Sequence, residues 1–422
     1  MIYGISDKPK AIKEWLLYSF QMMLSVVVAT VLIAQICGTP ADAAMFGGFI
    51  GTVIYASITK FKSPMFISSC GATVSAVCGA LAVGDGNNYT AVVIGGAMIA
   101  IIYIVMGLIV DWKGIDFFNS LFPPTIVGAV TIVIGLNLAT FIPTYVQVGA
   151  QQSNWGVIIA IITMLVVAVA SHYFKGFAKT IPFLIAIAVG YVLSTILTLT
   201  GAAPVIDFTS FKNTGLLHMP DFAFFHLNNT ITWKDVGTVA LKFVPVGLVA
   251  LLEHYSDHRV LSNIVGTDLT VEPGLRRTLW GDGIASFIGT VMCGLPNTSY
   301  GESIATIGYS KVASVWVTLG GALMLGLLAF ISPVQNFINS IPSCVFGGCA
   351  MILYGYIASS GLKTLLNNKV DLENQKNLVI VCVVLTVGVS GICLFTEAFS
   401  GVGLAMVLGL ILNFILKEKK VD

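Results

Sequence analysis

The chain reads Leu295-Pro296-Asn297-Thr298-Ser299-Tyr300-Gly301-Glu302 inside a stretch that is otherwise strongly apolar. The run starts with a proline and small polar residues, which favour extended backbone, and only afterwards becomes helical in character. It also carries a carboxylate, and a charged side chain at the centre of a bilayer costs at least ~2.5 kcal/mol. Such residues are normally retained for a substrate or an ion path. Glu302 is therefore a candidate functional residue.

The composition of the whole chain is typical of an integral membrane protein. Of its 422 residues, 56% are hydrophobic and 10% are charged, and the mean hydropathy is +0.92. That leaves too little polar side chain to cover a soluble globule. The apolar runs are long enough to cross a hydrocarbon core of about 30 Å. They predict about fourteen transmembrane segments, near 15–37, 45–59, 64–82, 91–110, 123–143, 155–173, 179–199, 236–256, 278–293, 297–310, 313–331, 342–361, 377–394 and 397–416.

The positive charges predict the orientation of these segments. With a cytoplasmic N-terminus, alternate loops place all but three of the 21 Lys and Arg residues on the inner side, the exceptions being Lys212, Lys234 and Lys242. Cytoplasmic loops carry such an excess. We therefore expect a multi-pass protein of the cell membrane with both termini in the cytoplasm. The net charge of +1 excludes no partner, but there is no basic cluster that would indicate nucleic acid. The apolar composition makes the lipid bilayer the expected partner.

A second stretch, 63–72, has the same order of a proline, extended polar residues and then a helix. Aligning Pro64 with Pro296 places Cys70 opposite Glu302. Together with a second match, this predicts two halves of about seven segments, the second inverted, in which segments 3 and 10 are short and preceded by extended strands. In secondary transporters, interrupted helices at matching positions of inverted repeats surround a midplane substrate site. The second match places Pro123, Gly128 and Ala139 opposite Pro342, Gly347 and Ala358.

Two more carboxylates lie one apolar segment earlier. Glu253 and Asp257 are four residues apart, so a helix places both on one face. Two carboxylates that share a site of low dielectric constant cannot both ionise cheaply, so one of Glu253 and Glu302 should hold a proton near neutral pH. This proton is a natural coupling ion.

The chain resembles the uracil permease branch of the nucleobase/ascorbate transporter family, also called nucleobase:cation symporters. The resemblance is carried by the run that ends at Glu302 and by the pairs Glu253-His254, Pro123-Pro124 and Ser68-Ser69. The resemblance covers nearly the whole chain. It implies an all-α fold with a 7+7 inverted repeat, proton symport of a nucleobase, an elevator-type movement of a core domain against a gate domain, and a homodimer formed through the gate. The core would comprise 1–116 (segments 1–4) and 236–334 (segments 8–11), and the gate 117–235 (segments 5–7) and 335–422 (segments 12–14).

The resemblance also implies roles for single residues. Glu253 matches the substrate carboxylate of segment 8, and Glu302 matches the second carboxylate, on segment 10. Cys70 stands where a Phe is expected to cover the bound ring, whereas Asp257 and Asp282 are more similar to the xanthine branch, since the uracil branch has His and Asn there. We expect substrate binding by Glu253, Glu302, Gly301, Tyr300, Cys70 and Ala29, and proton coupling by Glu253, Asp257, Glu302 and Asp282.

The chemistry of uracil fits these residues. The base offers two N–H donors and two carbonyl acceptors around a small flat ring, so its site needs carboxylates and N–H groups in one plane. Glu253 and Glu302 can accept the hydrogen bonds, and the backbone N–H groups of Gly301 and Cys70, at half-helix N-termini, can donate them.

For three polar residues a structural role competes with a functional one. Asp257 lies near the cytoplasmic end of its predicted segment and could equally face water. Asp282, within Trp280-Gly281-Asp282-Gly283, also fits a turn that starts a helix. His254 is, like most such residues, more often a packing residue than a ligand.

Other functions stay open as alternatives. A xanthine or other purine symporter fits the same pattern. A sulfate-transporter-like carrier shares the implied fold, but its anion would avoid facing acids. An intramembrane enzyme could use paired carboxylates, but the Gly-x-Gly-Asp string of aspartyl intramembrane proteases is absent, since Leu279 stands two residues before Gly281. A passive channel needs no buried carboxylate pair. The eight cysteines show no metal-ligand spacing, and no phosphate-binding loop is present. We therefore expect a transporter and no enzyme, with no cofactor or metal and with H⁺ as coupling ion.

Overall fold

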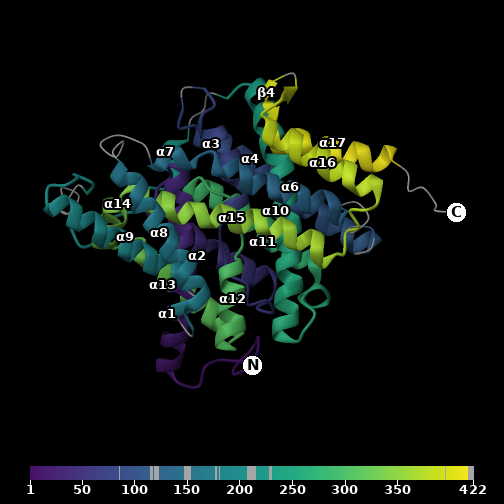
Figure 1. Ribbon diagram of the computed structural model, residues 1–422. Helices are drawn as coiled ribbons and strands as arrows, with labels where there is room; N and C mark the ends of the chain where they lie inside the picture. The colour runs from purple at the N-terminus through teal and green to yellow at the C-terminus, as the bar shows by residue number, and fades with distance from the viewer. Residues whose placement is uncertain are drawn as a thin grey trace.

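The computed structural model describes residues 1–84, 86–114, 117, 123–146, 154–175, 178–179, 181–206, 215–227, 231–394 and 396–416, and these are mostly helical (Figure 1). The first half contains α1 (Ile12–Cys37), α2 (Ala41–Ile58), the 3-10 turn η1 (Gly71–Thr73), α3 (Val74–Leu81), α4 (Tyr89–Lys113), α6 (Pro124–Ala139), α7 (Ile142–Val146), α8 (Asn154–Tyr173) and α9 (Pro182–Leu199). The second half contains α10 (Trp233–Val265), α11 (Leu275–Cys293), α12 (Gly301–Ser310), α13 (Val315–Leu328), α14 (Ser332–Ser340), α15 (Ser343–Asn367), α16 (Gln375–Ser390) and α17 (Gly401–Ile415).

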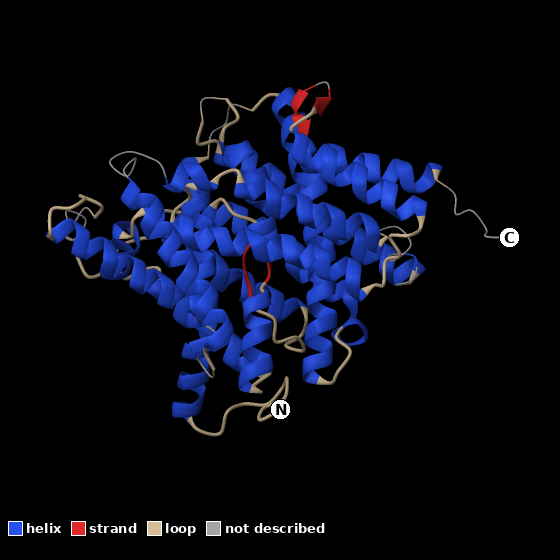
Figure 2. Cartoon of the chain, viewed as in Figure 1, coloured by secondary structure: helices blue, strands red, loops and turns tan. Residues whose placement is uncertain are grey.

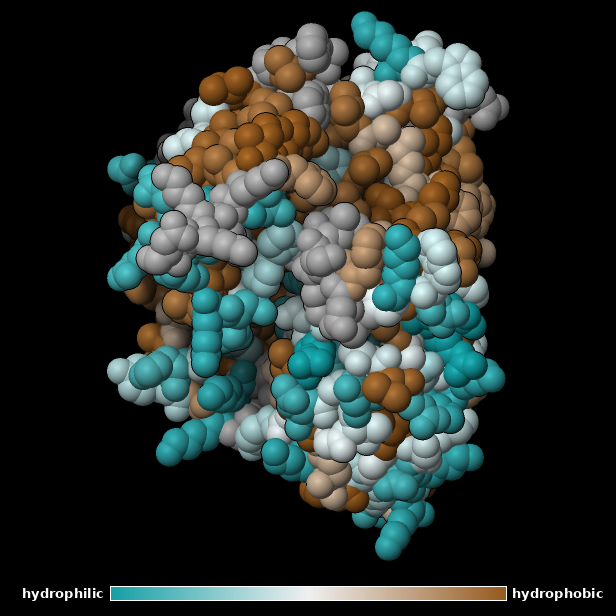
Figure 3. Space-filling view, turned by 90° about the vertical axis from the view of Figure 1, so that its right-hand side faces the viewer, coloured by the Kyte–Doolittle hydropathy of each residue, from teal (hydrophilic) through white to brown (hydrophobic). Residues whose placement is uncertain are grey.

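The helices have the length and surface of membrane spans. Among the described residues, eight helical segments are long and apolar enough to cross a bilayer, and four shorter apolar helices accompany them. Large apolar side chains are exposed on their outer faces, for example Leu108 on α4, Leu165 on α8 and Phe414 on α17. On one face, apolar surface gathers over the upper part and polar surface over the lower part (Figure 3). This arrangement fits helices that turn apolar side chains toward lipid.

Two short strands lie side by side at the centre of the molecule, where Figure 2 shows them in red among the helices. We call this pair the strand crossing. Strand β1 (Ile67–Ser69) pairs antiparallel with β2 (Asn297–Ser299), and Ser68 lies opposite Thr298. The first strand leads into η1 and α3, and the second leads into α12. The prediction that extended strands precede the short segments 3 and 10 is thus confirmed.

The backbone around this crossing shows which residues of the two halves correspond. The Cys70 N–H donates to the Pro296 carbonyl at 2.8 Å, and the Tyr300 N–H donates to the Phe66 carbonyl at 3.1 Å. Cys70 and Tyr300 each precede a short helix, so Cys70 corresponds to Tyr300 and Ala72 to Glu302. The predicted alignment of Cys70 with Glu302 was wrong by two residues. The reason is that Pro64 lies three residues before its strand and Pro296 only one.

The other predicted match, Pro123 with Pro342, agrees with the structure. Both prolines have extended backbone and directly precede a long helix, α6 and α15 respectively. These two helices cross closely. A Cβ added at Gly135 of α6 would lie 2.4 Å from the backbone nitrogen of Ala358 in α15, so only glycine permits this approach.

The helices pack as two groups. In the first, α1, α2 and α4 pack against α10, α11 and α13; in the second, α6, α8 and α9 pack with α15, α16 and α17. Between the groups, α1 contacts α9 and α15, and α10 contacts α6 and α17. A hydrogen bond of 2.8 Å from the Tyr145 hydroxyl of α7 to the Ile36 carbonyl of α1 also joins them.

Several predicted boundaries were wrong because hydropathy does not follow helix propensity. The segment predicted to end at residue 256 continues to Val265, where Gly266 ends it with a left-handed backbone. The segment predicted over 123–143, by contrast, agrees with the span Pro124–Val146, in which a turn at 140–141 separates α6 from α7. The end of segment 13 and the start of segment 14 form strands β3 (Cys393–Leu394) and β4 (Thr396–Ser400). Within the described part of the connection 200–235 there is a 3-10 turn, Ala223–His226, and a bridge between Leu217 and Ile331.

Candidate functional site

Side chains of α2 and β2 hold the two central strands in place. Thr52 of α2 accepts the Ile67 N–H at 3.1 Å and donates its hydroxyl to the Ile67 carbonyl at 2.9 Å. Asn297 donates from Nδ2 to the Gly47 carbonyl at 3.0 Å and to the Ala285 carbonyl at 3.3 Å. Hydrocarbon offers no partner to backbone polar groups, so a strand at membrane depth depends on such bonds.

The structure brings the four predicted carboxylates together beside this crossing. Glu253 and Asp257 lie on α10 and Glu302 in the first turn of α12, and these three are half-buried. Asp282, on α11, is fully buried. Glu253 lies close enough to Glu302 and Asp282 to interact electrostatically with both, and Asp257 interacts with all three. Four acids from three helices thus share one region.

Asp257 is part of this region and not a residue at a helix end. It lies more than one turn before the end of α10, and the Ser299 hydroxyl of β2 donates to its Oδ2 at 3.2 Å. The alternative that Asp257 merely faces water is therefore wrong. It connects α10 to the last residue of the strand that leads to Gly301 and Glu302.

Gly301 provides open space next to Glu302. It is exposed, and a Cβ added to it would meet no atom within 4 Å. As the first residue of α12 it has no carbonyl partner within that helix, and no hydrogen bond to its N–H occurs in the part of the chain that the structure describes. This N–H group is therefore available to a ligand.

Cys70 does not offer the N–H group that was predicted, because this N–H is bonded to the Pro296 carbonyl. The free N–H groups at this helix start belong to the next residues, Gly71 and Ala72, for which no hydrogen bond occurs among the described residues. Sequence reasoning missed them because the pairing of β1 with β2 cannot be seen in the sequence. The Cys70 side chain itself is buried and lies close enough to Glu253 to interact with it.

Tyr300 and Ala29 lie beside the crossing with buried side chains. Tyr300 is 3% exposed, and its hydroxyl has no hydrogen-bond partner among the described residues. Ala29 of α1 is 5% exposed and precedes Thr30, whose hydroxyl is 2.8 Å from the Ser68 hydroxyl of β1. Both residues contribute to the wall around the strands.

Asp282 is bonded to a histidine that sequence reasoning had assigned to packing. Its Oδ2 is 2.5 Å from Nδ1 of His254 and 3.4 Å from the hydroxyl of Thr298. Asp282 lies in the middle of α11, so the alternative of a helix-starting turn is wrong. His254 is fully buried, and this hydrogen bond adds to its packing. The two residues come from different helices, and no spacing in the sequence relates them.

The connection between α10 and α11 holds exposed charges. The hydrogen bond from Lys62, and its positive charge, hold the pKa of the Glu272 carboxyl below its ordinary value. A hydrogen bond from the Thr270 side chain does the same for the pKa of Asp268. Surface hollows of about 530 Å³ and 330 Å³ lie at this connection, and the first also touches the N-terminal segment. The predicted site residues line neither.

Two comparisons with known sequences place this chain among permeases. Residues 13–397 match a family model for xanthine/uracil permeases, described as "Permease family". The chain is 32% identical over 432 residues to the uracil permease of Bacillus subtilis (strain 168), covering 99% of this chain and 95% of that protein. It is also 32% identical over 421 residues to the uracil permease of Escherichia coli (strain K12), covering 98% and 94%.

Solved structures agree on the fold. The chain is similar to the transmembrane domain of a cyanobacterium bicarbonate transporter, BicA, with a TM-score of 0.65 and 15% identity, covering 96% of this chain and 98% of that one. It is equally similar to SLC26A9, with a TM-score of 0.65 and 13% identity, covering 96% and 66%. These similarities concern the fold alone and confirm the predicted 7+7 class.

Proposed function

This chain belongs to the nucleobase/ascorbate transporter family, and from that premise we propose that it imports uracil, or a closely related nucleobase, together with a proton. The predictions of a transporter, of no enzyme and of a multi-pass membrane protein are confirmed by the family and by the apolar helices. The substrate, the coupling ion and the movement are our proposals.

The convergence of Glu253 and Glu302 beside the open space at Gly301 carries the substrate proposal. The two carboxylates come from α10 and α12 and can accept the two N–H groups of uracil. The N–H groups of Gly301, and of Gly71 and Ala72 across the strand crossing, can donate to its carbonyls. Relatives named as uracil permeases, at 32% identity over nearly the full length, support this choice. Asp257 and Asp282 make xanthine the competing base.

Proton coupling follows from the density of acids at this point. Carboxylates close together in a region of low dielectric constant repel each other, so they do not all ionise. A bound uracil that donates to Glu253 favours the charged form of that residue, and the displaced proton must be held by a neighbour, Asp257, Glu302 or Asp282. Substrate and proton then move together across the membrane.

The two packing groups of helices support an elevator-type mechanism. We assign 1–116 and 236–334 to a core domain that carries the site, and 117–235 and 335–422 to a gate domain. The many contacts within each group, and the restriction of contacts between them chiefly to α1 and α10, support rigid-body movement. We further propose that the gate forms a homodimer and that both termini are cytoplasmic, because this orientation places most Lys and Arg inside.

Transport into proteoliposomes tests the substrate and the coupling ion. We expect an inward proton gradient to drive accumulation of radiolabelled uracil, and a protonophore to abolish that accumulation. Unlabelled uracil should compete better than xanthine, and bicarbonate or sulfate should not compete. Accumulation that survives the protonophore would refute the proton coupling, and stronger competition by xanthine would change the assigned base.

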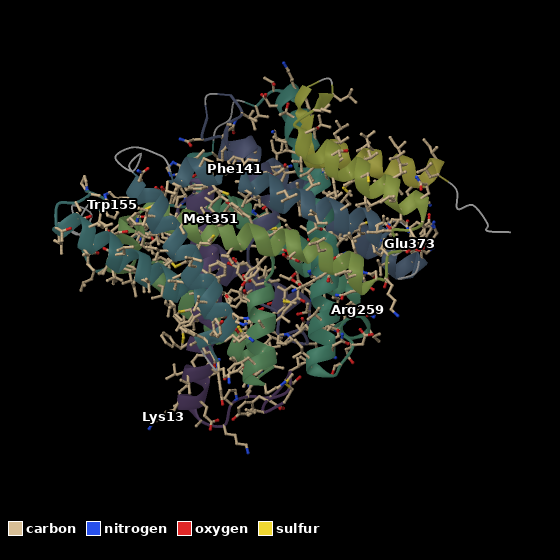
Figure 4. The ribbon with its side chains drawn as sticks, in the orientation of Figure 1. Lys13, Phe141, Trp155, Arg259, Met351 and Glu373 are labelled. Atoms are coloured by element: carbon tan, nitrogen blue, oxygen red, sulfur yellow. The ribbon has the colours of Figure 1, made fainter. Side chains whose placement is uncertain are left out.

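Substitution of Glu253 tests the site. Glu253→Gln should nearly abolish uracil binding, because the amide presents one acceptor and an unwanted donor, and an unmade buried hydrogen bond to a charged group costs about 1–3 kcal/mol. Glu373→Gln is the control, since Glu373 lies in an exposed loop at the edge of the molecule (Figure 4). Calorimetry that finds wild-type affinity in Glu253→Gln would place the binding site elsewhere.

A further inference from the structure

A series of buried polar groups runs from Asp282 to the connection between α2 and β1. Asp282 is bonded to His254, as described above. Nδ1 of His258, one turn further along α10, is 2.8 Å from the His254 carbonyl. Nε2 of His258 is 2.6 Å from the hydroxyl of Tyr55 on α2, and this hydroxyl is 2.8 Å from the hydroxyl of Ser63. All five residues are at most 1% exposed.

Two atoms of this series are not used by the hydrogen bonds that hold it together. Buried polar side chains are costly unless every group is satisfied. Here Nε2 of His254 and Oδ1 of Asp282 have no hydrogen-bond partner among the described residues. These two atoms are thus free to take part in a further hydrogen bond, which the transfer of a proton requires. The side chains involved, His, Tyr, Ser and Asp, are those that exchange protons readily.

The hydrogen-bond roles allow a proton to pass in either direction. A carbonyl only accepts, so Nδ1 of His258 carries the proton of its bond to His254, and Nε2 of neutral His258 is an acceptor. In this state Tyr55 donates to Nε2 of His258, and the Ser63 hydroxyl turns to donate to the Tyr55 oxygen, which reverses the bond from Tyr55 to Ser63 that the structure holds. With a protonated His258 both bonds reverse, so that Nε2–H donates to Tyr55 and Tyr55 donates to Ser63. A shift of one proton along each bond changes the first arrangement into the second.

The outer end of the series lies next to solvent. Ser63 follows Lys62, which lines the hollow of about 530 Å³ together with its ion-pair partner Glu272. Arg259, the neighbour of His258, lies in the lower half of the view with Lys13, which belongs to the N-terminal segment (Figure 4). In the proposed orientation this is the cytoplasmic side. A proton that reaches Ser63 is therefore one residue away from the wall of an open surface hollow.

We propose that Ser63, Tyr55 and His258 form the cytoplasmic part of a proton path that ends at the His254–Asp282 pair behind the substrate site. A proton from the hollow displaces the Ser63 proton to Tyr55, and the Tyr55 proton moves to Nε2 of His258. His258 then gives its Nδ1 proton to Nε2 of His254, which passes its own Nδ1 proton to the Asp282 carboxylate. At the end the Asp282 carboxyl is protonated, and Ser63, Tyr55 and both histidines are neutral. Release to the cytoplasm is the same sequence reversed.

The transfer between the two histidines is the slow step of this path. Their ring centroids are 4.0 Å apart and the rings are tilted by 32°, but no hydrogen bond joins their nitrogens. The His258 ring must turn away from the His254 carbonyl to reach Nε2 of His254. The titratable groups that surround His258 are His254 on its own helix, Tyr55 on α2 and Asp282 on α11.

Removal of single hydroxyls tests the path, which rests on the proposed uracil–proton symport. In proteoliposomes, Tyr55→Phe and Ser63→Ala should reduce proton-driven uracil uptake and uracil-driven proton flux by roughly tenfold or more. Exchange of internal for external uracil, which moves no net proton, should keep its wild-type rate, as should uracil binding. Tyr354→Phe is the matched control, because Tyr354 on α15 is 1% exposed and its hydroxyl has no partner among the described residues.

The separate measurements distinguish the possible failures. Wild-type net uptake and proton flux in both Tyr55→Phe and Ser63→Ala would overturn the path. Exchange that falls as much as net uptake would also overturn it, since the hydroxyls would then only support the fold. A wild type that neither binds nor exchanges uracil would overturn the proposed function, and the path with it.

Discussion

At the scale of a single residue, a substitution at Gly301 should change substrate binding without changing the fold. An added methyl group would meet no atom of the protein within 4 Å, so Gly301→Ala should fold normally. The same methyl group would occupy the space next to Glu302 where we place the substrate. We expect the affinity for uracil to fall by about tenfold or more, or ~1.4 kcal/mol, measured by calorimetry on the purified protein. Gly237→Ala is the matched control, because its Cβ also meets no atom within 4 Å. Equal affinities of the two variants would remove Gly301 from the site.

Asp257 gives a second test at this scale. Asp257→Asn keeps an oxygen that can accept from Ser299, but it cannot take up or release a proton. Uracil binding should therefore stay close to wild type, while accumulation driven by a pH gradient should fall and its pH optimum should shift. Asp371→Asn, in the exposed loop before α16, is the control. An unchanged pH profile in Asp257→Asn would show that Asp257 takes no part in proton coupling, which would then depend on Glu253, Glu302 and Asp282.

The sequence predicted the acids of the site better than their partners. A charge in an apolar run is conspicuous, so Glu253, Glu302 and Asp257 could be found without a structure. The bond between His254 and Asp282 could not, because it joins two helices whose rotation about their axes depends on packing. The role of the Cys70 N–H was predicted wrongly for a similar reason, since it depends on strand pairing across the two halves.

At the scale of helices, the crossing of α6 and α15 depends on glycine. A Cβ at Gly135 would lie 2.4 Å from the Ala358 nitrogen and 2.7 Å from the Tyr354 carbonyl oxygen, and these backbone atoms cannot turn aside. Gly135→Ala should separate the helices and destabilise the protein by about 1–3 kcal/mol. Thermal unfolding in detergent would measure this. Gly355→Ala, on α15, is the control because its Cβ meets no atom within 4 Å. Equal stability of Gly135→Ala and Gly355→Ala would show that α6 and α15 can move apart without loss of stability.

Hydropathy predicted that the helices exist, but not where some of them end. Ser256, Asp257, His258 and Arg259 end an apolar run, yet α10 continues through them because helix propensity does not depend on burial in lipid. The hairpin of β3 and β4 was missed because its few polar residues, Thr396, Glu397 and Ser400, are averaged with the apolar helices beside it. Turn geometry, which separates them, is a local backbone property that a hydropathy average does not contain.

At the scale of the whole molecule, the orientation in the membrane can be tested by labelling. In a Cys382→Ser background, which removes the one described cysteine that is exposed, a cysteine is introduced at Thr267 or at Leu216, both exposed. With cytoplasmic termini, an impermeant maleimide should label Thr267→Cys only in inside-out vesicles and Leu216→Cys only in right-side-out vesicles. The reverse pattern would invert the orientation, and the proton path would then open to the outside.

The pairing of β1 with β2 has a consequence for how the protein is made. Residues 67–69 leave the ribosome long before residues 297–299, and until the later strand arrives the ladder partners of the earlier one do not exist. Backbone groups without hydrogen-bond partners are not stable in lipid. Until β2 has been synthesised, β1 must therefore stay outside the bilayer or be shielded by the insertion machinery. Synthesis that stops between the two strands should therefore leave a product that quality-control proteases degrade rapidly. Two halves expressed as separate chains should protect each other from that degradation.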